Sequence, residues 1–321
     1  MTTNMKIAVL GAGAMGSLFG GLLAESGQHV TLLDIDEAHL DAIRQAGLRV
    51  QTDQGDRRVT NLEVRRPEAP GAEPDLLIVF TKSLHTRGAL SALRHLIGPE
   101  TFVLTLQNGL GNVEALSEFV APQRILIGVT TWPSDLVAPG HVSSHGEGQI
   151  RMMSADGVLR PEVEATARAL DAAGLNCEID PQVWTSIWEK VAFNAALNSL
   201  CAVTGCSVDG LGAVADGRAL ASQIVGEVLA VARTQGVDID AERCRAKVAH
   251  AIANHRGHKP SMLQDMLAGR RTEIEAINGA VVAKAGECGV PVPHTEILLQ
   301  LVRVAEARRL GEVARSAMPD A

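Results

Sequence analysis

A lysine and two asparagines recur at four-residue spacing within one apolar stretch of the chain. Lys190, Asn194 and Asn198 lie in residues 183–203, which are otherwise rich in Val, Ile, Leu, Ala and Trp and are typical of a helix. At roughly 100° per residue, successive members drift only about 40° around a helix, so the three side chains share one stripe. A lysine can donate a proton, and buried asparagines need hydrogen-bond partners. The stripe indicates a ligand-facing surface; the alternative is a solvated outer face.

A glycine-rich segment follows the apolar run 6–10 and opens a helix-like stretch at 14–26. Its first Gly permits a tight turn, its second lets a pyrophosphate approach the backbone, and its third lets the helix pack on the strand. Free N–H groups at the helix start can then hold an anion. We predict that this segment binds a dinucleotide through Gly11, Ala12, Gly13, Ala14, Met15 and Gly16; a tight turn without a ligand is the alternative.

An acidic residue ends the second predicted strand, 29–33. Asp34 stands where such a carboxylate accepts hydrogen bonds from the adenosine ribose and repels a 2′-phosphate. The chain continues with Asp36 and Glu37, and no Lys or Arg follows until Arg44. This pattern favours NAD(H) over NADP(H). The alternative is that Asp34 or Asp36 merely caps the next helix.

Three further polar residues are candidates. Asn108 follows the strand predicted at 101–106, at the edge where α/β sheets place ligands; an ordinary Asn-Gly turn is the alternative. Ser261 stands at a predicted helix start, with Ser261 as N-cap and Gln264 completing a capping box. Glu273, taken by itself, is typical of a surface carboxylate.

The residue counts exclude several chemistries. The chain contains no Tyr, so the tyrosine acid of short-chain dehydrogenases is excluded. Five cysteines without a CxxC pair indicate neither a disulfide framework nor structural zinc. His141 and His145 form the one HxxxH pair, in a stretch typical of a strand or loop, where the two rings do not share a face as on a helix. We therefore expect a reduced, cytoplasmic protein that holds no metal.

The first half of the chain alternates short β-rich runs with helical stretches, which predicts a doubly wound parallel sheet of the Rossmann α/β class. Residues 49–64 are compatible with an extra hairpin. From about residue 180, helical periods dominate: 183–203, 218–235, 243–254, 273–288 and 295–314. The prediction is a dinucleotide-binding domain over 1–180 and an all-helical domain over 181–321.

Charge and hydropathy exclude two classes of partner. The net charge is −8 and no basic tract occurs, so nucleic-acid binding is not expected. Residues 7–24 carry no charge and imitate a signal peptide or a membrane span. Because five of these residues are glycine, the strand and glycine-rich turn explain the segment better, and we expect no membrane partner.

Several motifs together resemble the ketopantoate reductase (2-dehydropantoate 2-reductase) family. They occur in the family's order and spacing: KIAVLGAGAMG at 6–16, QNG at 107–109, WEKVAFN at 188–194, SMLQD at 261–265 and TEIEAING at 272–279. The resemblance implies a Rossmann domain and a helical domain with the site in the cleft between them. It also implies hydride transfer from a nicotinamide to the ketone of a 2-oxo acid, converting 2-dehydropantoate to (R)-pantoate for pantothenate biosynthesis.

The resemblance further implies roles for individual residues. Lys190 would protonate or polarise the ketone oxygen, and Glu273 would orient Lys190 or bind near the nicotinamide ribose. The other roles are substrate binding by Asn194, Asn198 and Ser261, a place between cofactor and substrate for Asn108, and cofactor contacts from Lys82 and Ser134. A homodimer formed through the helical domain is expected by the same analogy.

Two departures from the family pattern leave alternatives open. Family members commonly carry an Arg after the second strand and use NADPH, whereas this chain has Asp34 and Asp36 there, so both cofactors stay open. Small residues are more usual in the family near Trp132 and Pro133, and the bulky Trp132 is expected to reshape the substrate pocket. An NAD-dependent D-2-hydroxyacid dehydrogenase acting on a bulkier acid is therefore the alternative. A dinucleotide sensor without turnover is disfavoured because Lys190, Asn194 and Glu273 are all present.

Overall fold

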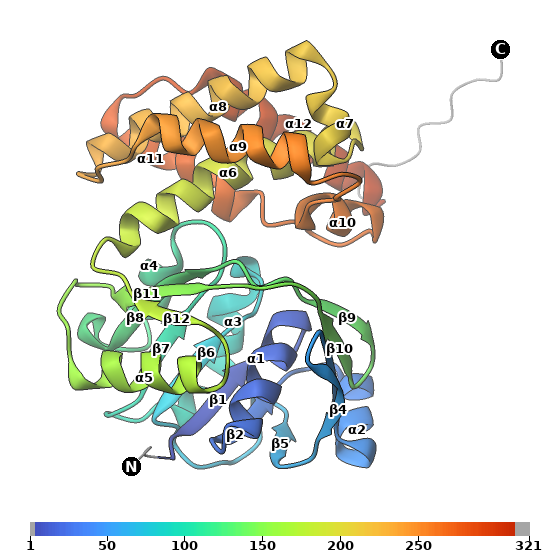
Figure 1. Ribbon diagram of the computed structural model, residues 1–321. Coiled ribbons are helices and arrows are strands. Elements are labelled where there is room, and N and C mark those ends of the chain that lie inside the picture. Colours follow the sequence, from blue (N-terminus) through green and yellow to red (C-terminus); the bar gives the residue numbers. More distant parts are fainter. Residues whose placement is uncertain (1–3, 312–321) are drawn as a thin grey trace. The chain divides into compact units, whose positions relative to one another are not determined.

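The computed structural model describes residues 4–311 (Figure 1), which divide into two units. The first unit runs up to Gln107 and again over Gly111–Ser186; the second takes Asn108–Leu110 and the chain from Ile187 on. The boundary predicted near residue 180 precedes the observed break, because the first turn of the next helix stays with the first unit. There Trp184 Nε1 donates to the carbonyl oxygen of Ala155 (3.3 Å), and Ser186 Oγ donates to Asp180 (2.7 Å).

The predicted Rossmann sheet forms the centre of the first unit, and it has eight strands (Figure 1). All neighbouring strands pair in parallel except β8 and β11, which are antiparallel. In spatial order the strands are β12 (Cys177–Ile179), β11 (Ile150–Ser154), β8 (Ile125–Thr130), β7 (Phe102–Thr105), β6 (Leu76–Val79), β1 (Lys6–Leu10), β2 (His29–Leu33) and β5 (Leu62–Arg65). Strand β6 is buried along its whole length, as its unbroken apolar run requires.

Within residues 4–186, α-helices connect the strands of this unit. They are α1 (Ala14–Glu25), α2 (Glu37–Ala46), α3 (Thr86–Ala92), α4 (Asn112–Ser117) and α5 (Pro161–Ala172). The uncharged segment 7–24 is thus strand β1 followed by helix α1. Within residues 4–311, no helix combines the length and the hydropathy needed to cross a bilayer.

The hairpin expected within 49–64 is present and belongs to a second, smaller sheet. Strands β3 (Leu48–Thr52) and β4 (Gly55–Val59) pair antiparallel, and β10 (His141–Ser144) joins β3 in parallel and carries β9 (Asp135–Ala138) at its other edge. The close approach of Gly21 in α1 to Val50 packs this sheet against the first helix. His141 lies on a strand, so its spacing to His145 does not bring the two rings to one helix face.

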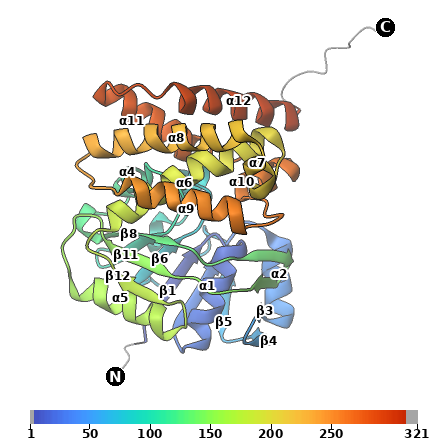
Figure 2. The same ribbon diagram turned by 45° about the horizontal axis from the view of Figure 1, so that its top comes forward.

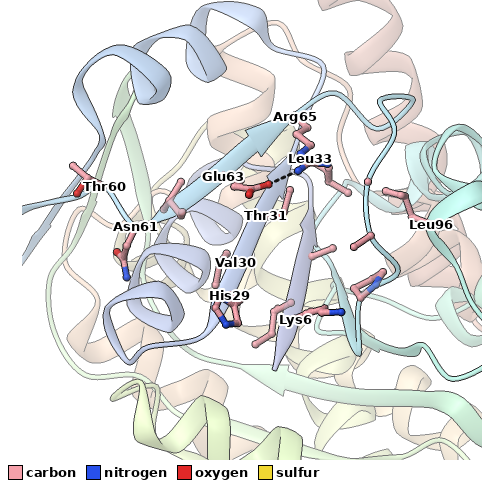
Figure 3. A pocket seen from close by; sticks show the side chains of 16 residues that line it. Lys6, His29, Val30, Thr31, Leu33, Thr60, Asn61, Glu63, Arg65 and Leu96 are labelled. Atoms are coloured by element: carbon pink, nitrogen blue, oxygen red, sulfur yellow. Dashed lines mark hydrogen bonds and ion pairs between the residues drawn. The ribbon is translucent and has the colours of Figure 1, made fainter. Parts of the chain in front are cut away.

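One face of the large sheet is open over β1, β2 and β5. Val30 and Leu32 approach α1 at Gly20, so Thr31 and Leu33 face the opposite side of the strand. The link from β5 to β6 carries no helix over that side, and a groove of about 550 Å³ remains there, lined among others by Lys6, His29 and Arg65 (Figure 3). None of the predicted site residues lines this groove.

The second unit is built from helices, of which α6 is buried along most of its length. These are α6 (Val183–Thr204), α7 (Val208–Gly212), α8 (Ala215–Thr234), α9 (Ala241–Asn254), α10 (Ser261–Leu267), α11 (Ala280–Cys288), α12 (Pro293–Arg309) and a π-helical turn, η4 (Glu275–Gly279). Helix α8 lies between α9 and α12 (Figure 2). The helix predicted at 273–288 is interrupted by η4, and residues 312–314 of the last predicted helix lie outside the described residues.

Candidate active site

The glycine-rich loop is held by its backbone at the carboxyl end of β1. Gly11 adopts φ +92° and donates its N–H to the carbonyl oxygen of Leu33 (2.8 Å). A Cβ on Gly11 would crowd the peptide between Phe80 and Thr81, and one on Gly16 would collide with the carbonyl oxygen of Gly11. The first and third glycines are therefore required by packing alone.

The second glycine faces open space. A Cβ on Gly13 would meet no atom within 4 Å, and Gly13 is the N-cap of α1 without a side-chain capping bond. The first turn of α1 carries no acidic residue, so nothing there opposes an anion at the helix N-terminus. An open approach to a long helix's free N–H groups fits the pyrophosphate of a dinucleotide.

Asp34 and Asp36 have different roles at the end of β2. Asp34 accepts the N–H groups of Ala12 (2.5 Å), Ile35 (2.7 Å) and Asp36 (3.0 Å), which fixes the carboxylate beside the glycine-rich loop. Asp36 is the N-cap of α2 and accepts the N–H of His39 (3.2 Å). The capping alternative is therefore correct for Asp36. Asp34 instead ties the loop to the strand end, and its carboxylate can still accept a further hydrogen bond from a ribose hydroxyl.

Sequence reasoning missed a cation at this end of the sheet. Arg66 Nη1 donates to the carbonyl oxygen of Ile35 (3.2 Å) and to Glu37 (3.1 Å), while its Nε donates to Glu68 (2.5 Å). The parallel register of β2 with β5, which pairs Leu33 with Arg65, puts the residues after both strands side by side. Counting charges along the chain after Asp34 could not reveal this neighbour.

The other predicted cofactor residues of the first unit lie on separate links. Lys82 directly follows Thr81, whose backbone N lies against Gly11, and precedes a 3-10 turn at Ser83–His85. Ser134 lies between β8 and β9; its Oγ is buried and makes no hydrogen bond within residues 4–311. Trp132 packs within the first unit: its indole N–H donates to the carbonyl oxygen of Leu175 (2.7 Å) and its ring covers Gly148. Packing within the first unit therefore accounts for this bulky side chain.

Asn108 belongs to the second unit, where its short segment docks on η4. Asn108 Nδ2 donates to Glu273 Oε2 (3.2 Å), and the N–H of Leu110 donates to the carbonyl oxygen of Ala276 (2.8 Å). Gly109 has φ +88°, and a Cβ there would collide with the same carbonyl. The Asn-Gly pair is thus a turn that also brings Asn108 and Glu273 together.

Lys190 is half-buried on α6, and its environment disfavours its charge. Burial lowers the pKa of Lys190 to about 8, and the nearby carboxylate of Glu273 offsets part of that effect. Glu273 is therefore not an isolated surface carboxylate, because it contacts Asn108 and interacts electrostatically with Lys190. An ammonium with a pKa near neutrality is suited to give up a proton.

The two asparagines of the stripe are buried, with exposed fractions of 7% for Asn194 and 5% for Asn198. The alternative of a solvated outer face is therefore wrong. Asn198 Nδ2 donates to Ser261 Oγ (3.3 Å). Ser261 is the first residue of α10 and Pro260 occupies the N-cap position, so the predicted capping box does not form. Gln264 donates instead to the carbonyl oxygen of Lys259 (3.0 Å).

A buried pair that the sequence did not single out holds η4 against α6. Ser199 Oγ donates to Asn278 Oδ1 (2.7 Å), and Asn278 Nδ2 donates to the carbonyl oxygen of Ala195 (3.2 Å). Single π-helical turns within helices are frequent at functional sites. Here the turn begins two residues after Glu273, and Asn278 fixes it to the helix that carries Lys190.

The geometry brings together, in one unit, a lysine, a carboxylate and several amide and hydroxyl groups. Two descriptions of known protein families match this chain: Ketopantoate reductase PanE/ApbA over residues 7–157, and its C-terminal region over 182–306. The chain belongs to the ketopantoate reductase family. It is therefore a nicotinamide-dependent oxidoreductase of the class that acts on a CH–OH group.

Relatives from distant organisms match nearly the full length. A 2-dehydropantoate 2-reductase of Streptococcus pyogenes is 34% identical over 94% of this chain and 98% of its own. One from Halobacterium salinarum is 35% identical over 94% of this chain and 99% of its own.

Two solved structures are similar over 95% of this chain and 99% of their own. A D-mandelate dehydrogenase with NADH and anilino(oxo)acetate has a TM-score of 0.89 and 31% identity. A 2-dehydropantoate 2-reductase described as putative, from Enterococcus faecalis, has a TM-score of 0.74 and 34% identity.

Proposed function

We propose that this protein reduces the ketone of a 2-oxo acid to the hydroxyl, with 2-dehydropantoate giving (R)-pantoate as the leading reaction. The observation that carries the proposal is the half-buried Lys190, whose pKa of about 8 lets its ammonium act as an acid at neutral pH. The 2-dehydropantoate 2-reductases that match nearly the full chain support this substrate.

A reduced nicotinamide bound to the protein would supply the hydride for C2 of the substrate. Lys190 donates its proton to the ketone oxygen, so the C=O bond becomes C–H plus O–H and the neutral amine recovers a proton from solvent. Glu273 stabilises the ammonium before the transfer and holds the side chain of Asn108. Asn194, Asn198 and Ser261 bind the substrate's carboxylate and hydroxyl groups, because amide N–H and hydroxyl groups are donors to such oxygens.

The residues after β2 favour NADH over NADPH in this proposal. Asp34 lies at the loop, Glu37 follows it, and the nearby Arg66 is engaged by Glu37 and Glu68. Arg44, which also pairs with Glu37, is engaged by Asp41 as well. A 2′-phosphate would meet this negative charge, and it would have to displace two carboxylates to reach either guanidinium. Gly11, Ala12, Gly13, Ala14, Met15 and Gly16 would hold the pyrophosphate, with Lys82 and Ser134 as further cofactor contacts.

A second candidate function is oxidation or reduction of a bulkier D-2-hydroxy or 2-oxo acid with NAD(H). The similarity in fold to a D-mandelate dehydrogenase that carries NADH supports it. The bulky Trp132, whose ring packs on Gly148, is consistent with a substrate pocket that differs from the usual one of the family.

We also propose a homodimer formed through α12. Ile297, Leu301 and Val304 are exposed at spacings of four and three residues and form one apolar stripe. In an antiparallel pair of α12 helices, the N-terminal Glu296 of one copy approaches the C-terminal Arg308 of the other. Exposed aliphatic stripes on soluble proteins mark interaction surfaces. Light scattering of the wild type and of Leu301→Glu tests this: the substitution should give monomers.

The decisive test of the activity is consumption of reduced cofactor in four parallel assays. Ketopantoate and benzoylformate are each offered with NADH and with NADPH. Faster NADH-linked turnover of ketopantoate is the expected result. Faster turnover of benzoylformate would contradict the leading reaction and select the second candidate. Turnover with NADPH alone would contradict the role given to Asp34, and no turnover with any pair would contradict the proposal.

A further inference from the structure

A buried histidine of the first unit connects three elements around the glycine-rich loop. His39, in α2, is 2% exposed, and its Nδ1 accepts the N–H of Gly140 (3.0 Å). Its Nε2 lies 3.0 Å from Oγ of Ser17, in α1. Gly140 forms the turn between β9 and β10. His39 therefore joins both helices that flank β2 to the second sheet.

The direction of these hydrogen bonds follows from the donors. The N–H of Gly140 can only donate, so Nδ1 of His39 carries no proton and the ring is neutral with its proton on Nε2. Nε2–H donates to Ser17 Oγ, and the Ser17 hydroxyl donates in turn to the carbonyl oxygen of Ala12 (2.7 Å). The result is a one-way chain of three hydrogen bonds that ends on the glycine-rich loop.

The last of these three hydrogen bonds fixes the peptide plane between Ala12 and Gly13. The N–H of Ala12 is held by Asp34 (2.5 Å) and its carbonyl oxygen by Ser17. Across a trans peptide, the carbonyl of Ala12 and the N–H of Gly13 point in opposite directions. Because the carbonyl points inward to buried Ser17, the N–H of Gly13 points outward, where Gly13 faces open space.

We propose that Ser17 and His39 are positioning residues for the dinucleotide, which orient the Ala12–Gly13 peptide so that the Gly13 N–H is presented to the pyrophosphate. The inference rests on the nicotinamide cofactor of the proposed function. Neither side chain touches the cofactor in this assignment. Their effect passes through the peptide plane alone.

The other end of this series of hydrogen bonds, at Gly140, is anchored well enough to hold the imidazole of His39 in place. The carbonyl oxygen of Gly140 accepts the N–H of Arg49 (2.8 Å), which pins the turn to β3. Gly140 has φ +71°, and a Cβ there would lie 2.9 Å from the Cβ of Ala42 in α2. The turn, α2 and β3 thus form one packed support for the imidazole.

Three substitutions in the full-length protein separate positioning from mere packing. Ser17→Ala removes the bond to Ala12. His39→Asn can keep an acceptor for Gly140 but cannot reach Ser17, whereas His39→Gln extends an amide N–H to the position of Nε2 and can still donate to Ser17. Ser91→Ala is the matched control, since Ser91 Oγ donates to the Arg87 carbonyl on the exposed side of α3, away from the loop.

The measurements are the calorimetric Kd for NADH and for ADP-ribose, kcat and KM for NADH, and the unfolding temperature. Ser17→Ala and His39→Asn should raise both Kd values and KM about 5-fold, which corresponds to the net contribution of one hydrogen bond. The kcat at saturating NADH should stay within about 2-fold of the wild type. His39→Gln and Ser91→Ala should stay within about 2-fold of the wild type in both Kd values, in KM and in kcat.

Unchanged Kd values in Ser17→Ala and His39→Asn would overturn the proposal, even if their unfolding temperatures fall. Equal weakening in His39→Gln and His39→Asn would also overturn it, because the link to Ser17 would then not matter. A wild type that binds ADP-ribose but reduces no 2-oxo acid would contradict the proposed function, while the ratios of Kd values would still decide this inference.

Discussion

Two neighbouring residues of α6 carry opposite charges into very different surroundings. Glu189 is only 7% exposed and accepts hydrogen bonds from two cations of α9, Arg243 Nε (2.8 Å) and Lys247 Nζ (2.6 Å). Lys190 is surrounded by a buried environment and lies near the carboxylate of Glu273. Because adjacent helix residues point about 100° apart, the two regions that face them are distinct.

The difference separates a structural ion cluster from a chemically active group. At Glu189 the charge is compensated twice by half-exposed cations, which tie α6 to α9. At Lys190 burial outweighs the attraction of Glu273, so the charged form is destabilised and the pKa falls to about 8. A proton donor needs a charge that can be given up, and a structural cluster needs one that cannot.

Removing the lysine gives the largest effect. Lys190→Ala should lower kcat for the 2-oxo acid by about 10²- to 10⁴-fold, the usual contribution of a general acid. Steady-state turnover at saturating NADH measures it. Lys190→Arg is the matched control, since a guanidinium keeps the charge but does not release its proton and should rescue little. The free energy of unfolding should hold or rise, because a half-buried charge is lost. Near-wild-type turnover in Lys190→Ala would remove Lys190 from the mechanism.

Removing the neighbouring carboxylate should have the opposite signature. Glu189→Gln leaves Arg243 and Lys247 without their shared anion and should lower the free energy of unfolding by about 1–3 kcal/mol. Turnover should stay within about 3-fold of the wild type, since the cluster takes no part in the chemistry. Urea unfolding gives the stability.

The control for Glu189 is an exposed pair of similar chemistry. Arg151 and Glu178 are both about half-exposed, so Glu178→Gln should cost less than about 1 kcal/mol. A loss of turnover in Glu189→Gln as large as that in Lys190→Ala, with stability kept, would erase the distinction between the two regions.

The sequence predicted the parts of this molecule that depend on local pattern. The glycine-rich loop, the parallel sheet and the central helix could be inferred because each is encoded by contiguous residues. Lys190, Asn194 and Asn198 could be grouped because helical spacing alone puts them on one stripe. The sequence left open whether that stripe was exposed to solvent or buried. The packing of the other helices against α6 decides between the two.

Features that depend on distant pairing were not predictable in the same way. Arg66 reaches the end of β2 through the register of β5, and Asn278 reaches Ser199 through the packing of η4 on α6. The capping box at Ser261 failed for a related reason: Pro260 takes the N-cap position, and the serine hydroxyl bonds to Asn198 on another helix. A partner far along the chain replaced the local one.

The pH dependence of turnover sharpens the comparison further. The reduction rate should fall as pH rises through about 8, because deprotonated Lys190 has no proton to give. The oxidation rate, which needs the neutral amine, should rise over the same range. Glu273→Gln removes the carboxylate that raises the pKa of Lys190, so the break should move to lower pH. Glu189→Gln should leave the break at the same pH. A profile that shifts with Glu189→Gln and not with Glu273→Gln would show that Glu189, rather than Glu273, raises the pKa of Lys190.

The smallest expected effect tests whether the stripe beyond Lys190 binds substrate. Asn198→Ala should raise KM for the 2-oxo acid about 3- to 10-fold with little change in kcat, because one uniform hydrogen bond is lost. Ser261→Ala should behave alike.

Since Asn198 Nδ2 and Ser261 Oγ are themselves hydrogen-bonded at 3.3 Å, the double variant should lose less than the sum of the two single effects in free energy. Strict additivity would mean that the two side chains act independently. An unchanged KM in all three variants would make this pair a structural link between α6 and α10, the counterpart of Glu189 with α9, and would confine the chemistry of the helix to Lys190.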